Sequence, residues 1–94
     1  MMSEIPKDLN KLNSIEKTKE ALRVGMIAEL DAINLYEQLA AIVADKKIKA
    51  VFEDIIKEEK THVGEFQTLL LKLDEEQKKE LEEGKKEVEN ITNE

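Results

Sequence analysis

Two runs of apolar residues in this chain repeat in alternating steps of three and four positions, which is the spacing of one face of an α-helix. The first run extends from Leu22 to Val43, and the second extends from Ile48 to Leu73. Only the polar segment 44–47, Ala-Asp-Lys-Lys, separates the two runs. A connection this short predicts that the two helices pack side by side and antiparallel, as a helical hairpin.

Capping signals predict where the helices begin. Asn13 and Asp74 are each followed three positions later by a Glu or a Gln, which is typical of a helix N-terminus. We therefore expect helices over about 14–43, 47–72 and 75–90. The third helix is expected to be the least stable element because its apolar row is thin. That row consists of Leu81, Val88 and Ile91.

The 94 residues suffice for one small all-α domain. We divide the chain into a flexible N-terminal arm over 1–12, a helical hairpin over 13–73, and an acidic C-terminal helix and tail over 74–94. Two or three helices of this length bury only a thin core on their own. Association with further copies of the chain is therefore expected.

The composition excludes several classes of protein. The chain has no Cys, which excludes disulfides and metal centres held by thiolates. Its 22 acidic residues exceed its 15 basic residues, and a net charge of −7 without a basic stripe argues against nucleic-acid binding. No apolar run approaches the ~20 residues of a membrane span, and the first residues lack the pattern of a signal peptide. We expect a cytoplasmic protein with no membrane partner.

Ionisable residues interrupt both apolar runs: Glu29 lies in the first, and Glu59 and His62 lie in the second. In a hairpin that turns near Asp45, the three positions lie at the same height because they are about equally distant from the turn. A carboxylate buried among apolar side chains is costly unless something compensates its charge. We therefore predict that Glu29, Glu59 and His62 are metal ligands. The alternative for Glu29 is an ion pair with Arg23 or with a lysine.

This set of residue types favours a particular kind of metal site. A di-iron site in a four-helix carboxylate bundle takes a Glu from each of two helices and a Glu-x-x-His pair from each of the other two. One hairpin offers half of that set on half of the helices. A two-fold dimer would complete both, so we expect a dimeric four-helix bundle with two iron ions per dimer. Carboxylates with one imidazole per metal suit iron or manganese better than structural zinc, which favours thiolates.

These residues make the chain resemble the encapsulated ferritins, a branch of the ferritin-like superfamily. The resemblance covers about 14–73, and it is carried by VGMIAELDAINLYEQLA in the first helix and EEKTHVGEF in the second. The family's ligands are a Glu on the first helix and a Glu-x-x-His pair on the second, which correspond to Glu29, Glu59 and His62. A Tyr seven residues after the first ligand also matches, as Tyr36.

The resemblance implies an activity and a set of partners. Members of the family form dimers around a di-iron centre, join the dimers into a ring that is typically a decamer, and oxidise ferrous iron with dioxygen. They are cargo of an encapsulin shell, which stores the product. We therefore expect a ferroxidase in an encapsulin nanocompartment of the cytoplasm, with Glu29, Glu59, His62 and Tyr36 as its catalytic residues and iron as its only cofactor.

Two features differ from the best-described encapsulated ferritins. Some of those carry acidic residues and a Trp near the first ligand as a metal entry site, where this chain has Ala28, Asp31 and Leu35. This difference puts a second metal site in doubt or reduces it to Asp31 with help from other residues. The family also often has a shell-targeting tail, whereas this chain ends in Glu-Asn-Ile-Thr-Asn-Glu. Either the tail is trimmed off, or the domain is fused to its shell protein.

Two functional alternatives stay open beside the ferroxidase. One is a peroxidase like the rubrerythrins, which would need a separate electron-donating partner because this chain has no Cys to hold an iron centre. The other is a helical assembly in which metal staples the subunits together and no reaction follows.

Several residues have both a structural and a functional interpretation. Tyr36 is either a core aromatic or a residue whose hydroxyl reaches a ligand carboxylate across the dimer. Gly25 and Gly64 are expected where helices approach closely. A second apolar stripe on the first helix, which includes Leu35 and Ile42, either contacts neighbours in a ring or is covered by the third helix.

Overall fold

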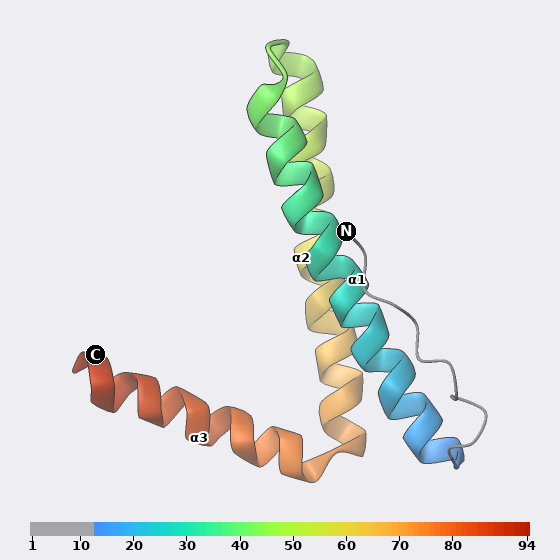
Figure 1. The fold of residues 1–94 in the computed structure, drawn as a ribbon, viewed down its shortest axis with the longest axis vertical. Helices are drawn as coiled ribbons and strands as arrows, with labels where there is room; N and C mark the ends of the chain where they lie inside the picture. The colour runs from blue at the N-terminus through green and yellow to red at the C-terminus, as the bar shows by residue number, and fades with distance from the viewer. Residues whose placement is uncertain (1–12) are drawn as a thin grey trace.

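The computed structural model describes residues 13–94, and within them it contains three α-helices and no strand. Helix α1 spans Ser14–Ile42, α2 spans Lys46–Leu73 and α3 spans Glu75–Thr92. The first two helices run antiparallel along each other, as Figure 1 shows. The predicted all-α hairpin is confirmed, and the predicted arm over 1–12 lies outside the described residues.

Side-chain caps explain where the helices begin. The side chain of Asn13 accepts a hydrogen bond from the backbone N–H of Glu16 at 2.8 Å, as the sequence predicts. Asp45 caps α2 in the same way, because its carboxylate accepts bonds from the backbone N–H groups of Lys47 and Ile48. The second helix therefore begins at Lys46, one residue before the predicted position, and the first helix ends at Ile42, so the connection is as short as predicted.

The core of the hairpin lies where α1 and α2 face each other. Ile33 and Ala40 of α1 and Ile56 of α2 are buried, with between 5% and 8% of each residue exposed. The partly buried side chains packed against them are Tyr36, Phe52 and Val63. This core is thin, as expected for two helices.

The predicted apolar stripe of α2 lies beside the core and is only partly covered by α1. The residues of α2 with the least exposure are Ile56 and Leu70, which lie next to the predicted stripe. Stripe residues remain exposed at 51% for Ile48, 50% for Leu69 and 40% for Leu73. The stripe therefore has an open side in a single chain, which a second hairpin would cover.

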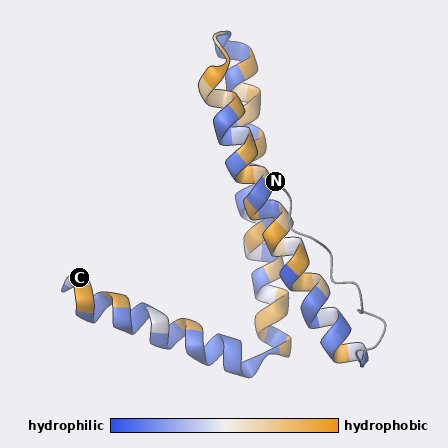
Figure 2. Cartoon of the chain, viewed as in Figure 1, coloured by the Kyte–Doolittle hydropathy of each residue, from blue (hydrophilic) through white to orange (hydrophobic). Residues whose placement is uncertain are grey.

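Helix α3 turns away from the hairpin (Figure 1), and in the described part of the chain it contacts α2 and not α1. The alternative in which the third helix covers the second stripe of α1 is therefore wrong. Leu35 and Ile42 of that stripe remain 48% and 79% exposed. The thin apolar row of α3 is also exposed, and Figure 2 shows its hydrophobic residues scattered among hydrophilic ones.

One aspartate fixes the bend between α2 and α3. The backbone N–H of Asp74 donates to the carbonyl of Leu70 at 3.0 Å, and its Oδ1 accepts from the backbone N–H of Gln77 at 3.0 Å. Its Oδ2 accepts from Nη2 of Arg23 on α1, also at 3.0 Å. Asp74 thus ends α2, begins α3 and joins the bend to α1.

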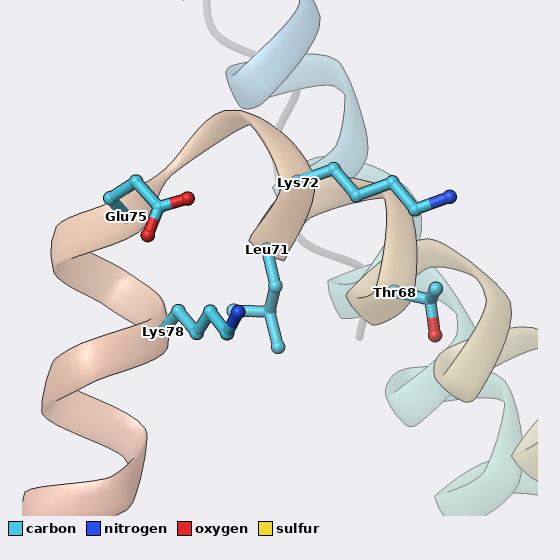
Figure 3. Close-up of a pocket in the computed structure, with 5 residues that line it drawn as sticks. All are labelled: Thr68, Leu71, Lys72, Glu75 and Lys78. Carbon is cyan, nitrogen blue, oxygen red and sulfur yellow. The ribbon is translucent and has the colours of Figure 1, made fainter.

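A groove of about 410 Å³ lies in the bend, lined by residues of α2 and the first turns of α3. Figure 3 shows the residues that line it: Thr68, Leu71, Lys72, Glu75 and Lys78. Of these, the two cations and one acid are exposed side chains. The predicted metal ligands do not line this groove, so it is separate from the candidate site.

Candidate metal centre

Three ionisable side chains from two helices meet near the middle of the hairpin. One carboxylate oxygen of Glu29, one of Glu59 and one ring nitrogen of His62 all lie within 4.8 Å of one another. Glu29 comes from α1, whereas Glu59 and His62 lie one turn apart on α2. The structure therefore brings together the three residues that the sequence predicts as ligands, while their role as ligands stays a prediction.

The imidazole lies between the two carboxylates. Nδ1 of His62 is 3.4 Å from Oε1 of Glu29 and 3.6 Å from Oε2 of Glu59. These are ion-pair distances only when the ring is protonated. With a neutral ring, two negative charges would face one lone pair, an arrangement that attracts a cation.

The two carboxylates are largely shielded from water. The side chains of Glu29 and Glu59 are 19% and 20% exposed, and that of His62 is 43% exposed. Oε2 of Glu29 is buried and has no hydrogen-bond partner. A buried carboxylate oxygen without a partner is costly, and a bound cation would remove that cost. Two carboxylates and one imidazole are also the donor types that iron and manganese accept.

The alternative partner of Glu29 is engaged elsewhere. Arg23 lies nearly two turns before Glu29 on α1, and its guanidinium donates to Asp74 at the bend. Glu29 is instead paired with His62. The proposal of an ion pair between Glu29 and Arg23 is therefore wrong.

Tyr36 lies beside the core and outside the three-residue group. Its ring centroid is 6.0 Å from that of Phe52, and the two rings are tilted by 33°. It packs against the buried cluster of the hairpin. Its role as a catalytic residue stays a prediction.

Asp31 also holds a buried carboxylate oxygen, Oδ2, without a hydrogen-bond partner. It is not part of the three-residue group. Glu65 is exposed and also lies outside the group. Neither residue is joined by enough further donors in the described chain to form a metal site on its own.

The close helix approach predicted at Gly25 is confirmed, but the sequence did not indicate which residue packs there. Phe66 of α2 packs end-on against Gly25 of α1, close enough that a Cβ atom at Gly25 would meet its ring. The signal for the close approach was the glycine itself, which interrupts an otherwise strong helical pattern one turn before Glu29. The second glycine predicted at a close approach, Gly64, has no atom of another side chain or helix within 4 Å of a Cβ built there.

One chain offers an incomplete site. Two carboxylates and one imidazole do not fill all the coordination positions of an iron ion. The open side of the α2 stripe lies next to the partly exposed ring of His62. A second hairpin packed on this side would bring the same three residues to the same place by symmetry.

Comparison with known proteins gives a consistent result. The family model described as Rubrerythrin matches residues 20–93. A ferritin-like–encapsulin shell fusion protein of Pyrococcus furiosus is 52% identical over 77 residues, which are 82% of this chain and 22% of the fusion protein. An encapsulin nanocompartment cargo protein, EncC of Myxococcus xanthus, is 37% identical over 57 residues, which are 61% of this chain and 44% of that protein. The chain thus spans less than half the length of either relative.

A solved structure resembles the whole chain. The crystal structure of an encapsulated ferritin domain from Pyrococcus furiosus matches with a TM-score of 0.84 at 45% sequence identity. The match covers 96% of this chain and 95% of that chain. Among the described residues, no helix is long and apolar enough to cross a membrane.

Proposed function

The chain belongs to the rubrerythrin family, among the encapsulated ferritins, and from this premise we propose that it is a ferroxidase, which oxidises Fe²⁺ to Fe³⁺ with dioxygen. The observation that carries the proposal is the convergence of Glu29, Glu59 and His62. The buried, unpartnered oxygen of Glu29 supports a cation as the missing partner. Membership of the family supports an iron-dependent function in general. The three-residue ligand group is the reason for proposing oxidation of Fe²⁺ in particular.

The three side chains have distinct tasks in this proposal. Glu29 and Glu59 supply anionic oxygens that hold the substrate Fe²⁺ and favour the more highly charged Fe³⁺ product. Neutral His62 supplies the nitrogen donor, since a ring nitrogen that binds a metal must carry a free lone pair.

The electron balance sets the stoichiometry. Each Fe²⁺ loses one electron to dioxygen. Reduction of one dioxygen to hydrogen peroxide consumes two Fe²⁺ and two protons, and reduction to two waters consumes four Fe²⁺ and four protons. The ratio of Fe²⁺ oxidised to dioxygen consumed thus identifies the product.

A two-fold dimer is part of the proposal because one hairpin holds only half of a di-iron site. Two chains supply four carboxylates and two imidazoles, and two Fe²⁺ ions balance the four negative charges. In the metal-free dimer the same carboxylates repel each other across the interface. Further assembly of dimers into a ring, such as a decamer, is proposed on the basis of the exposed stripes of α1 and α3.

We also propose that the protein acts inside an encapsulin compartment in the cytoplasm and delivers oxidised iron for storage there. The names of the two relatives support this, one being a fusion with an encapsulin shell and the other an encapsulin cargo protein. The shell protein is then a second partner besides the chain itself. Capture of the chain by a co-expressed encapsulin shell tests the proposed location.

The experiment that tests the activity is oxidation of Fe²⁺ under air by the wild-type chain and by Glu29→Ala, Glu59→Ala and His62→Ala. Absorbance reports Fe³⁺, and an oxygen electrode reports dioxygen. We expect many turnovers per site in the wild type and a loss of about a hundredfold or more in each variant. Undiminished oxidation in all three variants would rule the proposal out.

The family model also gives weight to a rubrerythrin-like peroxidase. The chain has no Cys for an electron-delivering iron centre, so this reaction needs a separate reductant. Faster oxidation of the iron-loaded protein by hydrogen peroxide than by dioxygen would favour it. Binding of two irons per dimer without any turnover would instead favour a metal-stapled assembly.

A further inference from the structure

The ring of Phe66 on α2 is seated against the backbone of Gly25 on α1. A Cβ atom at Gly25 would lie 3.1 Å from Cζ of Phe66 and 3.2 Å from each of its two Cε atoms. All three atoms at the end of the ring therefore lie against the position that a Cβ atom would occupy. Such distances are tighter than ordinary van der Waals contact, so a side chain at Gly25 would force the ring of Phe66 to shift by a few tenths of an ångström.

This contact lies one helical turn from the ligands on both helices. Gly25 is four residues before Glu29, and Phe66 is four residues after His62. In an α-helix that spacing stacks side chains on the same face, so the ring lies next to the ligand group on the side of the bend. On the opposite side, Ile33 follows Glu29 by four residues and is 8% exposed.

We infer that Phe66, seated on Gly25, is a wall that keeps water away from the ligand group on the side of the bend and holds His62 in position. We call this pair the Phe66 wall. The inference rests on the proposed metal site and adds two positioning residues to it. Oε2 of Glu29 is buried and accepts no hydrogen bond from a protein donor in the described residues, which is the environment that such a wall produces.

The wall has a chemical consequence. Each water excluded from the site removes one competing oxygen donor and strengthens the attraction between the carboxylates and a bound cation. Groups that orient metal ligands without touching the metal typically change metal affinity by about ten- to a hundredfold when altered. The glycine is otherwise unfavourable in the interior of α1, because alanine forms helices better. A role in seating Phe66 explains why glycine is found there.

The chain offers a matched control for this inference. Gly64 also lies inside a helix, and a Cβ atom there would meet nothing within 4 Å. Gly64→Ala and Gly25→Ala therefore share the same gain in helix propensity, and only the second disturbs Phe66. The double variant G25A/F66L supplies a compensating change, because leucine is shorter than phenylalanine and leaves space for the new methyl group.

The experiment uses the full chain and Co²⁺, whose visible absorption weakens when water raises the coordination number to six. We expect Gly64→Ala to bind Co²⁺ with the affinity and absorption of the wild type. Gly25→Ala is expected to bind about tenfold more weakly, with a weaker absorption band. G25A/F66L is expected to recover part of the affinity and part of the absorption. If Gly25→Ala weakened binding only by a general loss of stability, this recovery would not occur.

The outcomes separate this inference from the proposed function. A wild-type chain that binds no Co²⁺ would overturn the metal site and the wall together. Equal affinity and equal absorption in Gly25→Ala and Gly64→Ala would overturn the wall and leave the metal site standing. If Gly25→Ala does not fold, Phe66→Leu replaces it. That variant is expected to show the weakened band, and a wild-type spectrum from it would overturn the wall.

Discussion

Nδ1 of His62 lies 3.4 Å from Oε1 of Glu29, and this is the contact through which the two helices of the hairpin join their ionisable groups. Both residues interrupt apolar stripes, and the second oxygen of Glu29 is buried without a partner. The metal-free protein thus carries a carboxylate that costs free energy until a cation binds. The charge of Glu29 should therefore lower the stability of the metal-free protein and raise its affinity for metal.

Glu29→Gln is expected to separate these two properties. The substitution keeps the shape of the side chain and removes its charge, so the metal-free variant should unfold at the same temperature as the wild type or above it. Wild-type stability should rise on adding Mn²⁺, by about 2.7 kcal/mol at a hundred times the dissociation constant. The variant should lose most of that rise, which thermal unfolding with and without Mn²⁺ measures. An equal rise in both proteins would contradict a ligand role for Glu29.

The sequence predicts the helical hairpin well because helix caps and apolar periodicity depend on residues that are close together in the chain. Asn13 and Asp74 each accept a hydrogen bond from the backbone N–H three residues ahead, and both marked helix starts within one residue. The regular spacing of Glu29, Glu59 and His62 relative to one short turn was also enough to place them at one height. Because an α-helix rises by a constant ~1.5 Å per residue, the number of residues between a position and the turn gives its height along the hairpin. The contacts between the helices therefore did not have to be known.

What the sequence could not predict depends on contacts between elements. The direction of α3 follows from Asp74 and its bond to Arg23, and a helical pattern contains no information about such a bond. An uncovered apolar side was expected from the predicted dimer, but periodicity does not distinguish a residue facing α1 from one facing a second hairpin. Ile55 and Ile56 illustrate this, since only Ile56 is buried.

Ile56→Ala should destabilise the chain, because Ile56 is one of few side chains that fill the hairpin core. Removing a buried isoleucine side chain typically costs about 2 to 4 kcal/mol. Ile91→Ala on α3 is the matched control, since that residue is 80% exposed and should change stability by less than about 0.5 kcal/mol. Urea unfolding followed by circular dichroism measures both. Equal losses of stability in the two variants would show that Ile56 does not belong to the core.

The bend should respond to acid through Asp74. The hydrogen bond from the backbone N–H of Gln77 is the main reason that the pKa of Asp74 lies below its ordinary value of 3.8, and the side chain of Arg23 lowers the pKa further. Since the folded pKa is the lower one, the unfolded chain binds more protons, and this contribution to stability falls as the pH drops below about 4. It is fully present above that range.

Asp74→Asn tests this pH dependence, because asparagine also caps helices but does not titrate. Stability measured between pH 5 and pH 2 should fall less steeply in the variant than in the wild type. Arg23→Gln should reduce the slope by a smaller amount, since it removes the lesser of the two hydrogen bonds. Parallel slopes in the wild type and Asp74→Asn would mean that the bend does not depend on the ionised carboxylate.

Metal should promote association of the chain, because the proposed site needs two copies and the metal-free carboxylates repel each other. Light scattering after size exclusion should show a shift towards dimers or larger species when Mn²⁺ is added. His62→Ala should weaken that shift. The matched control is Glu37→Gln, which changes an exposed position on α1 outside the ligand group and outside the apolar stripes. A mass that is independent of metal in the wild type would contradict a metal site shared between two chains.

Tyr36→Phe separates packing from chemistry at the remaining predicted catalytic residue. The ring packs beside Phe52 and against the hairpin core, so phenylalanine should preserve the contact and leave stability within about 1 kcal/mol. If the hydroxyl reaches a ligand carboxylate of a second chain, its removal should slow Fe²⁺ oxidation by about tenfold without abolishing iron binding. Phe52→Leu is the opposite control, expected to lower stability and leave the rate per folded dimer unchanged. A wild-type oxidation rate in Tyr36→Phe would make Tyr36 a core aromatic and nothing more.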